Sequence, residues 1–215
     1  MYRMLYRARL RKNFNEERMK YFERSKEKIK DYIDKEKIMT LSLSCSGEDI
    51  FLYYECIEEM TMPDRLFENA REFLKPWPGE ESDRYFVPMM DIFHYNKPLS
   101  KEHWERKQKV DYRHVRVARL KPEMVSSYIF YHYQYQEESP GDGDKYGIIG
   151  IHENMLCFYL EHPTVKEASL YKGKLETNNT PEDWISLMLP HFILWEDAKE
   201  DQQIWRETEV ILSIL

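Results

Sequence analysis

The two halves of the chain carry the same order of apolar and polar runs. Each half opens with a run that contains Ala-Arg-Leu, at residues 6–14 and again at residues 115–123. A polar stretch with helical spacing follows, and then two apolar runs separated by a short polar turn. These paired runs, at residues 37–55 and 145–161, are rich in β-branched and aromatic residues and end in glutamate. That composition is typical of β-hairpins, so we expect one hairpin in each half.

The remaining segments complete a β-α-β-β-α-β order in each half. We expect the second helices at residues 86–93 and 184–193. A tryptophan, a charged patch and a closing strand follow at residues 103–114 and 204–214. This order is that of a ferredoxin-like unit. The sequence therefore predicts two repeats, at residues 1–110 and residues 111–215.

The repeat also predicts how the two sheets pack. A four-stranded sheet with both helices on one face leaves its other face bare, and bare faces of two such sheets can be buried against each other. A tandem repeat achieves this within one chain. The predicted fold class is therefore α+β, with two ferredoxin-like repeats packed sheet to sheet as a pseudo-symmetric α+β barrel.

Charge and composition narrow the function classes. The 215 residues carry a formal net charge of -7, which disfavours nucleic acid and anionic membranes as partners. No apolar run approaches the roughly 20 residues that a membrane-spanning helix needs. The three cysteines have no metal-ligand spacing, which indicates reduced thiols and a cytoplasmic protein. Neither a phosphate-binding glycine loop nor a nucleophile elbow is present, and we expect no metal.

The candidate chemistry lies on the predicted helix after residue 123. Tyr128 and His132 are one helical turn apart and share a face with Tyr135. Spacing alone is more typical of a structural histidine than of a catalytic one. His191, on the predicted second helix of the same half, is a reserve candidate for a second acid/base group.

The surrounding residues resemble the L-rhamnose mutarotase family. Residues 119–132, "RLKPEMVSSYIFYH", resemble that family's first strand-to-helix passage, and Tyr128 and His132 fall at its tyrosine and histidine. Residues 154–161 resemble its third strand. Trp184 falls on one position of the family's tryptophan pair, and the first half has Tyr85 and Phe86 at the corresponding place.

The resemblance implies a fused form of a homodimer, because known members are about half this length and pair as ferredoxin-like subunits. The chain would be a monomer with an intramolecular pseudo-dimer, and further homodimer formation is left open. Two departures matter. Tyr21 in the first half is followed four residues later by Ser25 rather than histidine, and Asp183 stands beside Trp184. Only the second half would then keep a working site.

The implied function is interconversion of the anomers of L-rhamnose or a related monosaccharide. His132 would move the proton, Tyr128 would orient the sugar, and Trp184, Tyr135 and His191 would bind it, without a cofactor. Two alternatives remain open. One is a non-catalytic relative that binds a sugar or metabolite. The other is a different protein on the same architecture, such as a cofactor-independent monooxygenase or a haem-handling protein.

Overall fold

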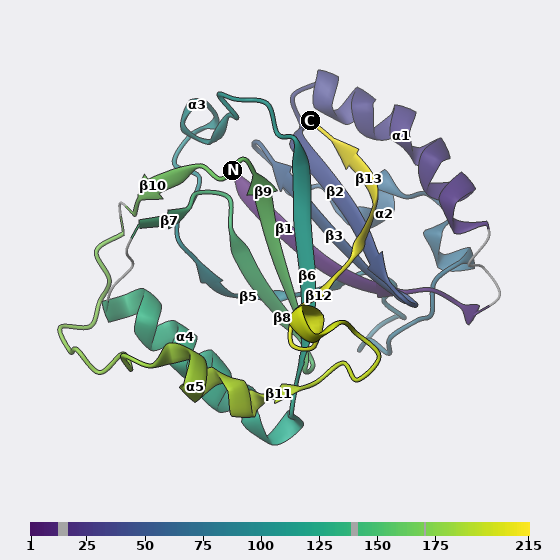
Figure 1. Ribbon diagram of the computed structural model, residues 1–215. Helices are drawn as coiled ribbons and strands as arrows, with labels where there is room; N and C mark the ends of the chain where they lie inside the picture. The colour runs from purple at the N-terminus through teal and green to yellow at the C-terminus, as the bar shows by residue number, and fades with distance from the viewer. Residues whose placement is uncertain (13–16, 139–141, 170) are drawn as a thin grey trace. The chain divides into compact units, whose positions relative to one another are not determined.

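The computed structural model describes residues 1–12, 17–138, 142–169 and 171–215, which form an α+β fold (Figure 1). Its described strands pair antiparallel. The chain divides into two compact units. Unit 1 comprises Met1–Met89, Pro98–Gln108 and Thr208–Leu215, and unit 2 comprises Met90–Lys97 and Lys109–Glu207.

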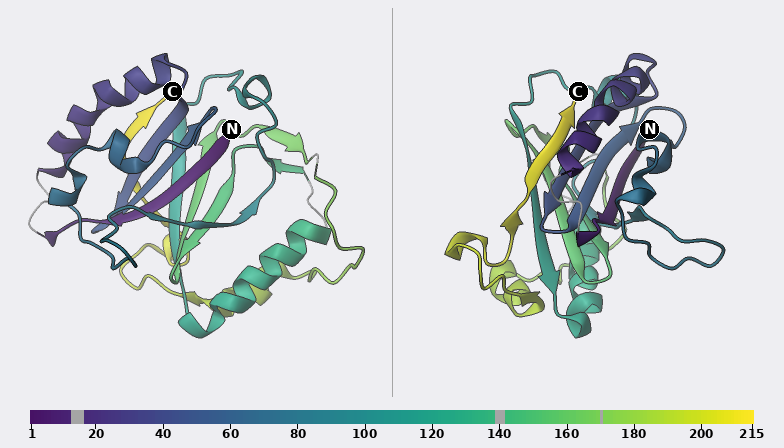
Figure 2. Two further views of the ribbon diagram at one scale, coloured as in Figure 1. Left: turned by 180° about the vertical axis from the view of Figure 1, so that it is seen from behind. Right: turned by 90° about the vertical axis from the view of Figure 1, so that its right-hand side faces the viewer.

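Unit 1 contains a five-stranded sheet with the order β13-β2-β3-β1-β4. These strands are β1 (Tyr2–Arg9), β2 (Ile38–Ser46), β3 (Asp49–Cys56), β4 (Val87–Pro88) and β13 (Glu209–Ile214). The helices are α1 (Arg18–Asp34), α2 (Pro63–Leu66) and α3 (Lys101–Trp104), with a short 3-10 helix, η2, at Ala70–Glu72. Helix α1 packs along the sheet over β13 and β2 (Figures 1 and 2).

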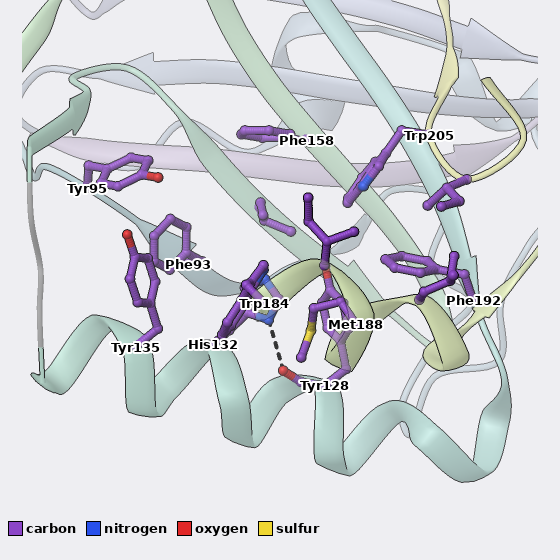
Figure 3. A pocket seen from close by; sticks show the side chains of 14 residues that line it. Phe93, Tyr95, Tyr128, His132, Tyr135, Phe158, Trp184, Met188, Phe192 and Trp205 are labelled. Carbon is purple, nitrogen blue, oxygen red and sulfur yellow. Dashed lines mark hydrogen bonds between the residues drawn. The ribbon is translucent and has the colours of Figure 1, made fainter. Parts of the chain in front are cut away.

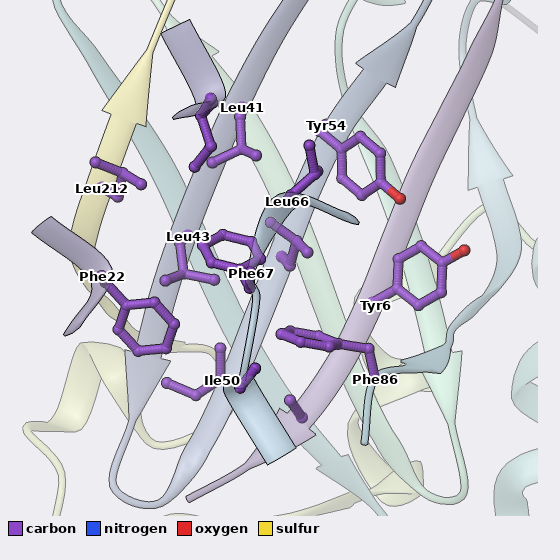
Figure 4. Close-up of a cluster of buried hydrophobic side chains, with 14 of the residues drawn as sticks. Tyr6, Phe22, Leu41, Leu43, Ile50, Tyr54, Leu66, Phe67, Phe86 and Leu212 are labelled. Atoms are coloured by element: carbon purple, nitrogen blue, oxygen red, sulfur yellow. The ribbon is translucent and has the colours of Figure 1, made fainter. Parts of the chain in front are cut away.

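The helix-facing side of this sheet is filled by side chains (Figure 4). Phe22 comes from α1, and its ring meets that of Phe67 edge to face at 5.6 Å between centroids. Phe67 in turn stacks on Phe86 at 5.7 Å. Three aromatic rings therefore occupy the space between the helices and the strands of unit 1.

Unit 2 contains a sheet with the order β11-β6-β9-β8-β5, and β12 also pairs with β6. These strands are β5 (Met90–His94), β6 (Tyr112–Leu120), β8 (Ile148–His152), β9 (Met155–His162), β11 (Phe192–Ile193) and β12 (Arg206–Glu207). A separate pair is formed by β7 (Asp142–Asp144) and β10 (Lys166–Ala168). The helices are α4 (Val125–Glu138) and α5 (Trp184–Met188), with short 3-10 helices η3 (Pro122–Met124), η4 (Leu189–His191) and η5 (Glu200–Gln202).

Both hairpins expected from the sequence are confirmed, as β2–β3 and β8–β9. The helix predicted at residues 86–93 is wrong, because this segment forms β4 and β5. Pro88 cannot sit inside a helix without breaking its hydrogen bonds, and burial alternates from Val87 to Met90 as in a strand. The closing strand predicted at residues 103–114 is also wrong, since α3 ends at Trp104 and the next strand begins at Tyr112.

The strand orders of the two sheets correspond. Each sheet has four core strands, which can be numbered one to four along the chain. Side by side they lie in the order fourth, first, third, second, as in a ferredoxin-like sheet: β4-β1-β3-β2 in unit 1 and β11-β6-β9-β8 in unit 2. Each sheet then gains one strand beside its second member: β13 beside β2 and β5 beside β8. The α+β ferredoxin-like class is thus supported, while the sequence repeat with its boundary after residue 110 and the closed barrel stay predictions. No helix among the described residues is long and apolar enough to cross a membrane.

Candidate functional site

Unit 2 contains a partly open cavity of about 350 Å³ between its sheet and the helices α4 and α5 (Figure 3). The size is in the range of small-molecule sites. The walls come from the sheet, from α4 and from the α5 segment, and most of the lining side chains are aromatic or aliphatic. They include Phe93, Ile149 and Phe158 on the strands, Tyr128, His132 and Tyr135 on α4, and Trp184 and Met188 on α5.

Helix α4 aims its three site residues at the sheet, as the spacing predicts. Tyr128, His132 and Tyr135 stand at positions i, i+4 and i+7 and project into the cavity (Figure 3). Pro122 begins the preceding 3-10 turn, where its missing N–H leaves no helical bond unmade. Phe130 and Tyr133 lie on the opposite face and are exposed.

The tautomer of His132 follows from its hydrogen bond. Its Nδ1 lies 2.9 Å from the main-chain oxygen of Tyr128, and a carbonyl oxygen can only accept, so Nδ1 carries the proton. Nε2 is left with a lone pair, and no group among the described residues hydrogen-bonds to it. Burial lowers the pKa of His132 to about 4, so the ring is neutral at pH 7. His132 is therefore an unprotonated base in an apolar cavity.

Tyr128 contacts this base directly. The two rings are 4.1 Å apart between centroids, and the side chain of Tyr128 is buried. Burial raises the pKa of the Tyr128 hydroxyl, so that the group stays protonated and can donate a hydrogen bond at neutral pH.

Trp184 is placed by a capped helix start. The carboxylate of Asp183 accepts from the backbone N–H of Ser186 at 3.0 Å, which begins α5 at Trp184. The Trp184 ring meets His132 edge to face at 5.0 Å and lies 5.4 Å from the Tyr135 ring. The structure thus brings Tyr128, His132, Tyr135 and Trp184 to one cavity.

Further lining residues were missed by the sequence reasoning. Phe93, in the segment wrongly predicted to be helical, stacks on Tyr135 at 5.5 Å. Tyr95 meets Phe93 at 4.8 Å, and burial, together with the Tyr135 hydroxyl, raises the pKa of Tyr95 to about 12. Phe158 and Trp205 form another part of the wall, 5.8 Å apart. In the sequence these residues appear only as part of alternating apolar runs, and such runs do not show which face of a strand lines a cavity.

His191 lies beside this group and is not a lining residue of the cavity. Its ring meets the Tyr128 ring edge to face at 5.9 Å. Both ring nitrogens have partners: Nδ1 lies 3.2 Å from the Met188 carbonyl oxygen and Nε2 lies 2.8 Å from Ser127 Oγ. His191 therefore lies between Ser127 in the first turn of α4 and Met188 at the end of α5.

In unit 1, Tyr21 and Ser25, which occupy the positions of Tyr128 and His132 in the predicted repeat, make different contacts. The Tyr21 hydroxyl donates to the carbonyl oxygen of Glu68 at 2.7 Å, and Ser25 Oγ donates to that of Tyr21 at 3.3 Å. The three cysteines form no disulfide with one another, and all are buried. Within the described ranges, no cluster of three or more histidine, cysteine or acidic side chains could hold a metal ion.

No family model matches the chain, and no curated protein does either. Two solved structures resemble it. A protein from Lactobacillus acidophilus NCFM, described as a candidate monooxygenase, is 9% identical over 98% of this chain and 94% of its own, with a TM-score of 0.42. A protein from Fusobacterium nucleatum subsp. nucleatum, described in the same words, is 11% identical over 98% of this chain and 92% of its own, with a TM-score of 0.39.

The resemblance to the L-rhamnose mutarotase family is wrong as an assignment. No family model supports it, and neither similar structure is described as a mutarotase. The cavity also offers a physical reason. A monosaccharide carries a hydroxyl on most carbons, and each buried hydroxyl without a partner costs about 1–3 kcal/mol. The lining is mostly aromatic and aliphatic, so the polar atoms of its tyrosine, histidine and tryptophan side chains would have to serve all of these hydroxyls.

Proposed function

We propose that the cavity of unit 2 binds a largely apolar, aromatic small molecule and that the protein oxidises it with O₂ as a cofactor-independent monooxygenase. The observation that carries this proposal is the neutral His132, whose unprotonated Nε2 belongs to an almost wholly apolar cavity. Such a base is unprotonated and can accept a proton at neutral pH, but its lowered pKa makes it a weaker base than an ordinary imidazole, so the ligand must carry an acidic C–H group.

Binding rests on the aromatic walls. Phe93, Tyr135 and Trp184 present rings in several orientations within 5.0 to 5.5 Å of their neighbours. A planar ligand can stack on such faces or meet their edges, which adds to the free energy gained from removing apolar surface from water. The cavity of about 350 Å³ suits a ligand of two or three fused rings.

The proposed reaction converts a CH₂ group flanked by an aryl ring and a carbonyl into a ketone. Nε2 of His132 takes one proton from this carbon, and the ring system delocalises the resulting carbanion. The carbanion reduces O₂, a C–O bond forms, and the returned proton gives a hydroperoxide. Loss of the remaining C–H proton and cleavage of the O–O bond then yield the ketone and water. One O₂ is consumed for each ketone and each water formed.

Tyr128 would support the first step. Its protonated hydroxyl can donate to the carbonyl oxygen on which negative charge develops, and such a donor lowers the barrier only as the charge forms. The position of Tyr128 one helical turn before His132 puts both groups on one wall.

The test has a binding arm and a turnover arm. Binding is followed by the fluorescence of N-phenyl-1-naphthylamine, an apolar dye, and we expect saturable binding to wild type. Turnover is followed by O₂ uptake with tricyclic aryl ketones that contain an acidic CH₂. His132→Gln should lower turnover by about 10²–10⁴ with little change in dye affinity, and Tyr128→Phe should lower it less.

His103→Gln, a histidine change in unit 1, is the matched control and should leave both arms unchanged. Dye binding without O₂ uptake for any ketone would overturn the monooxygenase proposal and leave a binding protein. Absence of dye binding would overturn the whole proposal.

A further inference from the structure

One charged side chain belongs to the same row of the sheet as the floor of the cavity. Four directly paired residues cross the strands β6, β9, β8 and β5: Arg116, Phe158, Ile149 and Phe93. Directly paired residues on neighbouring strands point to the same face of a sheet. Phe158, Ile149 and Phe93 line the cavity, so the fourth member, Arg116, lies on the cavity side of the sheet.

Arg116 stands against two rings of the cavity wall. Its Cζ lies 5.2 Å from the ring centroid of Phe158 and 6.0 Å from that of Trp205. Both rings also line the cavity. The guanidinium group therefore flanks the Phe158–Trp205 end of the cavity, next to the lining residues although not one of them.

No carboxylate in the part of the chain that the structure describes forms a close ion pair with Arg116, although the charge of Glu207 acts on it from farther away. Its Nε is buried and has no hydrogen-bond partner there. Glu207 is the residue directly opposite on β12, but its carboxylate lies 3.2 Å from Nε2 of His114 and forms no ion pair with Arg116. Burial lowers the pKa of Arg116 by more than the charge of Glu207 raises it, which supports a cation held partly out of water.

Two other buried or partly buried arginines of the described chain have a carboxylate partner. Arg7 pairs with Asp49 at 2.9 Å, and Arg106 pairs with Glu55. A partly buried cation without such a partner is costly, and an anion that supplies the missing acceptors would offset this cost. The chain carries a net charge of -7, so a single local cation could decide whether an anionic ligand is accepted.

We propose that the cavity takes an aromatic acid, with its rings between Phe158 and Phe93 and its carboxylate at Arg116. This inference rests on the proposed function, because it names the ligand class of the same cavity. Arg116 is the specificity-determining residue. It selects an anion at the Phe158–Trp205 end, while His132 acts on the ring system.

The test compares two ligands of nearly equal shape. 2-Naphthoic acid is ionised at neutral pH and 2-naphthamide is neutral. Each is titrated against bound N-phenyl-1-naphthylamine, and its Kd is obtained from displacement of the dye. The proteins are wild type, Arg116→Gln, Arg116→Lys and the control Arg24→Gln, which removes one exposed charge from α1.

We expect wild type to prefer the acid. Arg116→Gln should weaken binding of 2-naphthoic acid by about tenfold or more, because a charge-assisted hydrogen bond is worth at least that factor. Binding of 2-naphthamide should change by less than about twofold on the same scale. Arg116→Lys should keep part of the preference, and Arg24→Gln should keep all of it.

Equal weakening of both ligands, or of neither, by Arg116→Gln would overturn the inference while the dye still reports a working cavity. Absence of dye binding to wild type would overturn the proposed function and this inference together. If Arg116→Gln does not fold, the salt dependence of wild type decides. If NaCl weakens binding of 2-naphthoic acid but not of 2-naphthamide, the role of Arg116 is supported. If NaCl affects both ligands equally, the inference is overturned.

Discussion

Nδ1 of His132 donates to the main-chain oxygen of Tyr128 at 2.9 Å, and the two rings lie 4.1 Å apart. The hydrogen bond assigns the proton to one nitrogen, and burial keeps the second nitrogen unprotonated. The helical turn thus sets the tautomer of the base, and the burial of the ring sets its protonation state.

The first prediction concerns the protonation of His132. Because burial lowers its pKa to about 4, its ring signals should titrate near pH 4 rather than near the ordinary pH of about 6.5. Proton-detected NMR of the histidine rings measures this midpoint, and His132→Gln identifies the signal by removing it. Any turnover that depends on His132 should likewise fall only as the pH drops toward 4. A midpoint at 6 or above would contradict the buried, neutral base.

The second prediction is the matching effect on stability. The pKa of His132 is lower in the folded than in the unfolded chain, so the unfolded chain binds a proton first as the pH falls. Above pH 6.5 the neutral His132 side chain contributes roughly 3 kcal/mol to the free energy of unfolding, and this contribution is lost as the pH falls from 6.5 to 4. Urea unfolding of wild type should show this loss, and His132→Gln should lack that part of the slope. Parallel pH profiles for the two proteins would contradict it.

The third prediction concerns Glu138, near the end of α4. Its carboxylate accepts from the backbone N–H groups of Asn179 and Thr180, at 3.0 and 2.7 Å, and holds the segment that leads into α5. Partial burial alone would raise the pKa of Glu138, but hydrogen bonds from Thr177, Thr180 and Asn179 outweigh it and lower the pKa to about 2. The anion should therefore persist down to about pH 2.

Glu138→Gln removes the negative charge and weakens these bonds. We expect faster amide hydrogen exchange at residues 179 and 180 at pH 7, measured by mass spectrometry or NMR. Glu123→Gln, an exposed change near the start of α4, should leave exchange there unaltered. Equal protection in Glu138→Gln would show that other contacts hold the segment.

The fourth prediction concerns the buried carboxylate of unit 1. Glu55 is fully buried and accepts from Arg106 and from the Trp104 indole, each at 2.8 Å. Burial alone would raise the pKa of Glu55, but the Arg106 charge lowers it. Arg106→Met removes the ion-pair partner of this carboxylate, leaving the weaker influence of the Arg3 charge, and should lower the free energy of unfolding by about 3–5 kcal/mol.

Urea unfolding at pH 7 measures this change, with Lys109→Met as an exposed control. The double variant Arg106→Met, Glu55→Gln should recover part of the loss, because the uncompensated charge is then gone. A loss below about 1 kcal/mol, the range of exposed ion pairs, would contradict a buried pair.

The sequence by itself determined the local elements of this protein. The two hairpins and the helix that carries Tyr128 and His132 follow from periodicity over a few residues, and the structure confirms them. The same periodicity put Tyr135 on their face. At residues 86–93 the apolar spacing suggests a helix, but Pro88 is incompatible with a helix interior and the segment forms strands.

The tertiary structure alone decided which side chains meet. Phe93 and Arg116 are far apart in the chain, yet strand register places them in one row with Phe158 and Ile149. Likewise β5 extends the sheet of unit 2, although it follows β4 of unit 1 directly in the chain. Register and strand order depend on long-range pairing, which local residue patterns do not encode. The apolar cavity and the cation at its edge therefore became visible only once the strands were paired.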